Sequence, residues 1–117
     1  MSPQRGGIYL ADLNPRRGTE PGKTRPVLVL QTDLLNDAGH PSTVVFPLTS
    51  RIIDDAEPLR VRAPPEAGLE MPSDILIDQL RAIDNSRLVM RVASLPIRTM
   101  KTVERCISVL LDLAHRQ

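Results

Sequence analysis

Residues 22–32 read GKTRPVLVLQT, and the second half of this stretch decides the fold. The part from Arg25 to Thr32 is short, apolar and rich in β-branched residues, so we expect a buried strand over residues 25–32. Arg25 stands at the entrance of this strand, directly before Pro26. Because proline biases the residue before it toward extended backbone, the Arg25 side chain should leave the strand entrance in a defined direction.

Further strands are predicted on both sides of this one. Residues 8–13 read IYLADL and form a first strand, which the loop NPRRGTEPGKT joins to residues 25–32. At eleven residues the loop exceeds an ordinary hairpin connection, and long loops on β scaffolds are often functional. Residues 43–50, TVVFPLTS, form a third strand in which Pro47 indicates a sheet edge or a bulge.

A short fourth strand is predicted at residues 59–62, LRVR. The apolar and basic residues alternate there with the period of a strand, so Leu59 and Val61 should face inward. Arg60 and Arg62 should then face solvent.

The remaining pattern predicts a mainly β fold with one C-terminal helix. Residues 73–84, SDILIDQLRAID, form one long strand or two that bend. Ser94 and Pro96 are placed to start a helix, and apolar residues then recur at helical spacing. These apolar positions are Met100, Val103, Ile107, Leu110, Leu111 and Ala114. Short strands followed by an amphipathic helix indicate a small antiparallel barrel or sandwich, in a single domain over residues 1–117.

Composition sets broad limits on function. No apolar run approaches the roughly 20 residues that a spanning helix needs, and the start has no apolar stretch long enough for a secretory signal, so we expect a cytoplasmic protein. A net charge of +1 does not by itself indicate a nucleic-acid binder. Most of the 15 basic residues are arginine, whose planar fork suits phosphate.

Few residues favour metal or nucleophilic chemistry. His40 and His115 lack a second ligand at a recognisable metal spacing, and Cys106 falls within the helical pattern as a buried thiol. Asp54 and Asp55 are adjacent, which on a strand would point them to opposite faces, as for solvated acids. A metal-assisted nuclease stays open as an alternative, but we expect no metal and no cofactor.

The chemistry that remains is that of cationic and hydroxyl groups. A guanidinium held at Arg25 can neutralise charge that develops on a phosphate, an effect worth about 3 kcal/mol in a water-poor site. Thr49 and Ser50 close the third strand and can donate hydrogen bonds to a phosphate oxygen if the strands meet at one end of the barrel. The alternatives are an arginine whose stem covers the barrel end and a hydroxyl pair that caps a turn.

Four blocks of the sequence, taken in order, resemble the MazF/PemK-type toxins of bacterial toxin-antitoxin pairs. The blocks are GGIYLADLNPRRGTEPGKTRPVLVLQTD, PLTS, ILIDQLRAID and the terminal amphipathic helix, and they cover nearly the whole chain. The resemblance implies an SH3-like antiparallel barrel that forms a homodimer and is held inactive by a cognate antitoxin. It also implies metal-free cleavage of single-stranded RNA, in which a ribose 2′-hydroxyl attacks the neighbouring phosphate and leaves a cyclic phosphate and a 5′-hydroxyl.

The resemblance also implies roles for individual residues. Arg25 of the RPV motif assists proton transfer and stabilises the transition state, while Thr49 of the TS motif hydrogen-bonds a non-bridging oxygen. By resemblance, Thr19, Glu20, Lys23, Asp78, Gln79 and Arg81 are expected to contact RNA. From their charge or hydroxyl alone, Arg16, Arg17 and Ser50 are expected to contact it as well, and the alternative for Arg16 and Arg17 is a pair of solvated loop charges. Some members carry a catalytic arginine two residues before the aspartate at 78, but Leu76 stands here. We therefore expect Asp78 to contact RNA, and whether it is also catalytic stays open.

Two alternative functions stay open. A related barrel family poisons DNA gyrase by protein contact, and a non-catalytic RNA-binding barrel would also carry an arginine-rich loop. The pair of Arg25 and Thr49 favours cleavage, because neither alternative needs it.

Overall fold

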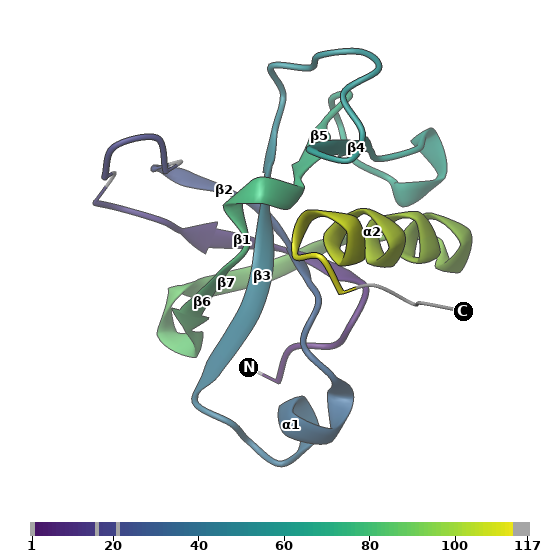
Figure 1. The fold of residues 1–117 in the computed structure, drawn as a ribbon. Helices are drawn as coiled ribbons and strands as arrows, with labels where there is room; N and C mark the ends of the chain where they lie inside the picture. The colour runs from purple at the N-terminus through teal and green to yellow at the C-terminus, as the bar shows by residue number, and fades with distance from the viewer. Residues whose placement is uncertain (1, 16, 21, 114–117) are drawn as a thin grey trace.

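The computed structural model describes residues 2–15, 17–20 and 22–113, which form an antiparallel sheet and a long C-terminal helix (Figure 1). The strands are β1 (Gly7–Asp12), β2 (Thr24–Val29), β3 (Ser42–Thr49), β4 (Arg60–Arg62), β5 (Asp74–Leu76), β6 (Arg81–Asp84) and β7 (Leu88–Ser94). The helices are α1 (Asp33–Asp37) and α2 (Ile97–Leu110), with 3-10 turns η1 (Pro65–Ala67), η2 (Ile77–Gln79) and η3 (Asn85–Arg87). The predicted class, mainly β with a C-terminal helix, is confirmed.

The sheet has seven strands in the order β4-β5-β3-β2-β1-β7, and β6 pairs with β3 as well. β3 pairs with β6 along its first half and with β5 at its end, so Pro47 falls between the two ladders. A proline, which has no N–H to donate, is tolerated at such a break. Within the part of the chain that the structure describes, no ladder joins β4 to β7, and the barrel is therefore open on that side.

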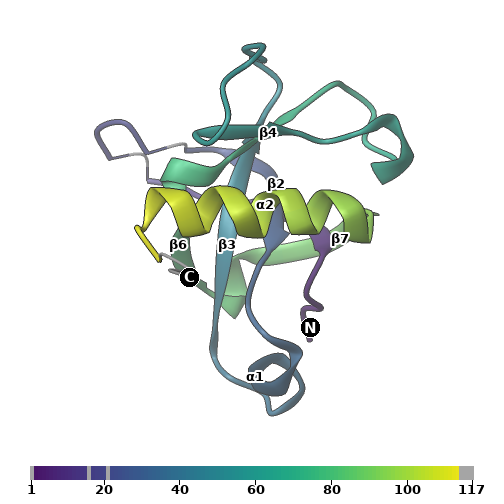
Figure 2. The same ribbon diagram turned by 45° about the vertical axis from the view of Figure 1, so that its right-hand side comes forward.

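The central strands are buried on both faces, which explains their unbroken apolar runs. One face packs against α2, which lies across the sheet in Figure 2. The buried residues of this cluster include Ile8, Leu28, Phe46, Leu48, Ile75, Met100, Val103 and Ile107. The alternate residues of the same strands point to the opposite face. That second cluster comprises Tyr9, Ala11, Leu13, Val27, Val29, Val45, Ile83 and Leu88.

The helix α2 begins after Pro96 and is amphipathic, as its spacing predicts. Its buried residues include Met100, Val103 and Ile107. Cys106 is buried with them, and this burial raises the pKa of its thiol. Leu111 lies at the exposed end of the helix, and Ala114 lies outside the described residues. None of the described helices is long and apolar enough to cross a membrane.

Some details differ from the sequence-based expectations. Residues 73–84 form two strands separated by a 3-10 turn, which is the bent alternative. Val61 is buried as expected, but the prediction for Leu59 was wrong, since this side chain is 51% exposed just before β4 begins. The prediction that Arg60 faces solvent was also wrong, because its guanidinium pairs with a buried carboxylate. Neither α1 nor β7 was predicted from the sequence.

Candidate active site

A cleft of about 730 Å³ opens where the ends of β2 and β3 meet β7. The first wall of the cleft consists of residues from β1, from β2 and from the position before β2. The second wall consists of the end of β3 and the residues after it, and the third wall belongs to β7. The connection between β4 and β5 closes the fourth side. The lining residues are Leu10, Lys23, Thr24, Arg25, Pro26, Leu48, Thr49, Ser50, Arg51, Gly68, Leu69, Glu70, Met71, Ser73, Met90, Arg91 and Val92.

Arg25 is half-buried in the wall of this cleft. Its Nε donates to the carbonyl oxygen of Gly22 at 2.9 Å, and its Nη1 donates to the carbonyl oxygen of Leu48 at 3.4 Å. A guanidinium held by two backbone carbonyls keeps one orientation, because both acceptors belong to the main chain. The structure therefore places a fixed cation at the entrance of β2, next to the end of β3.

Thr49 lies on the neighbouring strand in the same cleft. Val27 of β2 pairs with Pro47 of β3, and continuing this antiparallel register by two residues places Arg25 opposite Thr49. The Thr49 hydroxyl oxygen accepts a hydrogen bond from the Arg51 N–H at 3.2 Å, so the turn-capping alternative is realised. Accepting this bond does not use the hydroxyl hydrogen, which is the donor that a phosphate oxygen would need.

The cleft is strongly basic although the chain as a whole carries a charge of only +1. Among the residues that the structure describes, four basic side chains line it, against one carboxylate, that of Glu70. Two of the four, Lys23 and Arg25, come from the β2 side, and the other two are Arg51 and Arg91. Positive charge concentrated in a concave surface attracts an anionic ligand more strongly than the net charge suggests.

Arg91 of β7 is held in place by several contacts. Its Nη1 donates to Gln4 Oε1 at 2.5 Å and its Nη2 to Ser94 Oγ at 2.7 Å. Its guanidinium carbon lies 5.8 Å from the centroid of the Tyr9 ring. Arg91 and Arg51 were not predicted from the sequence. The apolar residues around Arg91, which mark strand β7, are the signal that could have revealed it.

Most of the described residues of the loop between β1 and β2 that are expected to contact RNA do not line the cleft. Lys23 lines the cleft, whereas Arg17, Thr19 and Glu20 belong to the loop that projects from the body of the molecule in Figure 1. Arg16 lies outside the described residues. The base of the loop is tied by two bonds, from the Leu13 N–H to the Lys23 carbonyl at 2.8 Å and from the Lys23 N–H to Asn14 Oδ1 at 2.8 Å.

The expected residues near position 80 are not brought to the cleft. Asp78 is exposed and Gln79 half-buried in η2, which packs near α2, β3 and β4. Arg81 begins β6 opposite Val45, and its Nη1 is buried without a hydrogen-bond partner among the described residues. The cleft thus gathers Arg25, Thr49, Ser50 and Lys23 from the predicted set and leaves this group of three outside.

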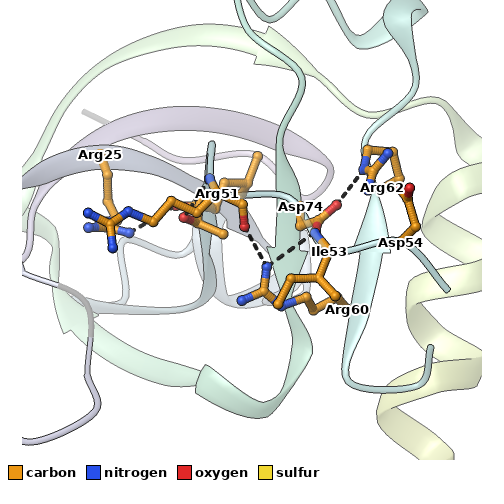
Figure 3. Close-up of polar contacts among 9 residues, drawn as sticks. Arg25, Arg51, Ile53, Asp54, Arg60, Arg62 and Asp74 are labelled. Atoms are coloured by element: carbon orange, nitrogen blue, oxygen red, sulfur yellow. Dashed lines mark hydrogen bonds and ion pairs between the residues drawn. The ribbon is translucent and has the colours of Figure 1, made fainter. Parts of the chain in front are cut away.

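A network of charges lies behind the second wall of the cleft (Figure 3). Its centre is Asp74, which is only 1% exposed and accepts hydrogen bonds from Arg62, from Arg60 and from the N–H of Ile53. Burial by itself would raise the pKa of the Asp74 carboxyl, but these three donors outweigh it and hold that pKa below its ordinary value. Asp74 is therefore a carboxylate at neutral pH, and it is matched by two cations.

Metal ligands are not grouped in the described part of the chain. No set of three or more His, Cys, Asp or Glu side chains there is arranged to hold a metal ion. The groups that converge on the cleft are guanidinium, ammonium and hydroxyl donors, which suit phosphate oxygens. The fold and the cleft together describe a small open β-barrel with a basic cleft whose donors suit an anionic ligand.

Comparison with known proteins places the chain in a family. Residues 4–111 match the family described as PemK-like, MazF-like toxin of type II toxin-antitoxin system. Endoribonuclease EndoA of Bacillus subtilis is 36% identical over 114 residues, which cover 97% of each chain. MazF from Deinococcus radiodurans superposes with a TM-score of 0.80 at 28% identity, covering 96% of this chain and 98% of that one. A MazE-MazF structure from the same organism gives 0.77 at 27% identity, covering 97% and 99%.

The chain belongs to the PemK-like, MazF-like toxin family. The resemblance drawn from the sequence blocks is thus confirmed, and the expected barrel-like fold agrees with the superposition on MazF.

Proposed function

We propose that this protein is the toxin of a toxin-antitoxin pair and acts as a metal-independent endoribonuclease on single-stranded RNA such as mRNA. One observation carries the proposal: the cleft brings Arg25 and Thr49 together among basic side chains. The relationship to endoribonuclease EndoA supports it. Its action on mRNA places the protein in the cytoplasm.

The reaction needs no protein nucleophile. The ribose 2′-oxygen attacks the adjacent phosphorus, the bond from phosphorus to the 5′-oxygen breaks, and the products are a cyclic phosphate and a 5′-hydroxyl. The 2′-hydroxyl proton must leave and the departing 5′-oxygen must gain one. In the transition state, negative charge builds up on the non-bridging phosphate oxygens. Hydrogen-bond donors that are already oriented toward these oxygens therefore lower the barrier most.

Arg25 and Thr49 are the donors in this proposal. The Arg25 guanidinium, oriented by the Gly22 and Leu48 carbonyls, stabilises the negative phosphorane and assists proton transfer to the leaving oxygen. A guanidinium is a poor general base, so the acid and electrostatic roles are the ones assigned to Arg25 here. The Thr49 hydroxyl donates to a non-bridging oxygen.

The remaining predicted residues are proposed to hold the RNA on either side of the reacting phosphate. Lys23 and Ser50 do so within the cleft. Arg16, Arg17, Thr19 and Glu20 would contact the strand where it leaves the cleft along the loop, and Asp78, Gln79 and Arg81 would contact RNA that extends beyond it. With one tyrosine, one phenylalanine and no tryptophan in the chain, recognition depends on hydrogen bonds more than on base stacking.

A homodimer and a cognate antitoxin complete the proposal. β7 is an edge strand with large exposed apolar residues, namely Val89, Met90 and Val92. An exposed apolar edge strand is a natural site for a second copy to pair, and it would extend the cleft into a groove between two protomers. The MazE-MazF structure supports an antitoxin as partner. In this proposal a flexible segment of the antitoxin lies across that groove.

The test is incubation of the purified protein with a long single-stranded RNA in excess EDTA, followed by mapping of the fragment ends. The proposal predicts cleavage at a recurrent short motif, cyclic-phosphate and 5′-hydroxyl ends, and loss of cleavage in Arg25→Ala. Intact RNA, or cleavage that EDTA abolishes, would contradict it. Inhibition of gyrase supercoiling by protein that leaves RNA intact would instead favour the gyrase-poisoning alternative.

A further inference from the structure

The segment that follows Thr49 is held by the buried carboxylate of Asp74. Asp74 pairs with Thr49 in the ladder between β3 and β5. Its Oδ2 accepts from the Ile53 N–H at 2.8 Å and from Arg60 Nη1 at 3.2 Å, while its Oδ1 accepts from Arg62 Nε at 2.5 Å. All three donors thus converge on one side chain, as Figure 3 shows.

The same two arginines also contact the segment directly. Arg60 Nη1 donates to the carbonyl oxygen of Arg51 at 2.8 Å, and Arg62 Nη2 donates to Asp54 Oδ1 at 2.9 Å. Together with the bond from Ile53, these contacts fix the backbone on both sides of Ile52. The conformation of residues 51–54 therefore depends on the Asp74 charge, through one direct bond and two arginines.

Arg51 is the residue that this arrangement directs into the cleft. Its backbone is held at the N–H by the Thr49 hydroxyl and at the carbonyl by Arg60, while its exposed side chain lines the cleft together with Arg25. In Figure 3 the Arg51 side chain runs away from the Asp74 network on the side where Arg25 lies. The β4 arginines are engaged within the fold, whereas the Arg51 guanidinium faces the space where a ligand would sit.

A contribution to the stability of the fold is a poor explanation for this buried network of charges. A buried ion pair can often be replaced by apolar residues of similar volume without loss of stability, because removing charges from water is costly. Such a fully hydrogen-bonded charged cluster can instead hold neighbouring groups in one orientation. Here the cluster is adjacent to Thr49 and contacts Arg51, Ile53 and Asp54 in the segment that follows it. Because Arg51 lines the cleft, the cluster can affect the cleft through that residue.

We infer that Arg51 binds a phosphate next to the one that is cleaved, and that Asp74 is a positioning residue that holds Arg51 in place through Arg60 and Ile53. This inference rests on the proposed function, and it adds an RNA contact and its support to that site. Arg51 is a binding group in this scheme, so its loss weakens RNA binding more than it slows the bond-breaking step.

The experiment measures binding and cleavage separately. Binding is followed by fluorescence anisotropy with a 2′-O-methylated single-stranded oligonucleotide, which cannot supply the attacking hydroxyl, over a range of salt concentrations. Each phosphate contact contributes about −0.7 to the slope of log affinity against log salt for single strands. Arg51→Gln should reduce the magnitude of the slope by about 0.7, raise KM several-fold and leave kcat within about twofold. Arg105→Gln, which removes an exposed arginine of α2 outside the cleft lining, is the matched control and should change neither.

The link to Asp74 is tested by combining variants. Asp74→Asn should reproduce the loss of slope, and the double variant with Arg51→Gln should be no worse than the more severe single variant, because both remove one contact. Arg60→Gln breaks the bond to the Arg51 carbonyl while leaving the Asp74 and Arg62 pair, so it tests the same link if Asp74→Asn does not fold. If the double variant loses as much slope as the two single variants together, the positioning role of Asp74 is overturned. A folded Asp74→Asn and an Arg60→Gln that both keep the wild-type slope would overturn it as well.

The outcomes also separate this inference from the proposed function. Wild-type protein that cleaves RNA and binds the oligonucleotide, with an unchanged slope in Arg51→Gln, would overturn the inference and leave the proposed function standing. Wild-type protein that neither cleaves RNA nor binds the oligonucleotide would overturn both.

Discussion

Arg25 donates from Nη1 to the carbonyl oxygen of Leu48, the residue directly before Thr49, at 3.4 Å. This bond joins the entrance of β2 to the end of β3 and sets the guanidinium beside the threonine that the proposed reaction uses. The two side chains come from positions 24 residues apart in the chain, and the strand register is what brings them together.

Replacing Arg25 tests the electrostatic role. Arg25→Ala should lower kcat by about a hundredfold to a thousandfold, the loss typical of removing one preorganised donor to a developing anion. Arg25→Lys keeps the charge but not the planar fork, so it should recover only part of the rate. Arg98→Ala, at an exposed site on α2, serves as control and should cleave RNA at the wild-type rate. Equal rates for Arg25→Ala and this control, measured by single-turnover cleavage, would rule out the assigned role.

Two substitutions of Thr49 separate the effect of its hydroxyl on cleavage from the effect of its side-chain volume. Thr49→Val removes the hydroxyl at nearly constant volume and should reduce kcat by roughly a hundredfold, since the donor to the non-bridging oxygen is lost. Thr49→Ser keeps both the donor and the acceptor for the Arg51 N–H, and should stay within about tenfold of wild type. The same single-turnover assay measures both variants, and a Thr49→Val variant as fast as Thr49→Ser would show that the hydroxyl is not needed.

Acid stability should depend on Asp74. Its pKa is lowered on folding, because the hydrogen bonds from Arg62, Ile53 and Arg60 outweigh the effect of burial, so its contribution is present above the unfolded-state pKa. That contribution is lost as pH falls through the folded-state pKa. Asp74→Asn should cost about 2 kcal/mol at pH 7, and the difference from wild type should shrink as pH drops below about 4.

Urea unfolding midpoints at several pH values between about 3 and 7 measure this difference. Asp33, Glu66 and Asp84 also have lowered pKa values and are present in both proteins, so the comparison between the two isolates Asp74. A difference that stays constant over the whole range would show that the Asp74 charge does not stabilise the fold.

If β7 forms the proposed dimer interface, a charge added on β7 should disrupt the dimer, whereas a charge added on α2 should not. Val89 is 54% exposed on the edge strand β7, and Val109 is 61% exposed on α2. Val89→Asp should convert dimer to monomer at micromolar concentration, because a carboxylate would be buried without a partner in the interface. Val109→Asp, the matched control, should leave the dimer intact. Light scattering gives the mass of each, and a wild-type protein that is itself monomeric would remove the dimer from the account.

Much of the fold follows from local patterns in the sequence. The apolar run of β2 and the helical spacing of α2 were recognised because each element carries a complete local signal. The prediction for Leu59 was wrong because it lies at a strand end, where alternation no longer determines exposure. β7 was missed although five of its seven residues are apolar, because apolar and polar residues do not alternate in it and most of its residues are exposed.

The candidate site was predictable only in part. Arg25 and Thr49 were selected from motifs, and the meeting of their strands was an assumption that the register between β2 and β3 supports. Arg51 and Arg91 were missed because their place in the cleft depends on a loop and a strand whose partners are distant in the chain. The partners of Asp74 were equally hidden, since the pairing of Arg60 and Arg62 with one carboxylate arises from tertiary packing.

The most direct test of the central claim uses a single-stranded RNA in which one ribose, the one that supplies the attacking hydroxyl at a mapped cleavage site, is replaced by 2′-deoxyribose. The protein is incubated with this RNA and with the all-ribose RNA in excess EDTA. We predict scission of the all-ribose strand with a cyclic phosphate at the new end, and no scission at the substituted site. Scission of the deoxyribose-containing strand at that site would contradict attack by the 2′-hydroxyl and with it the proposed mechanism.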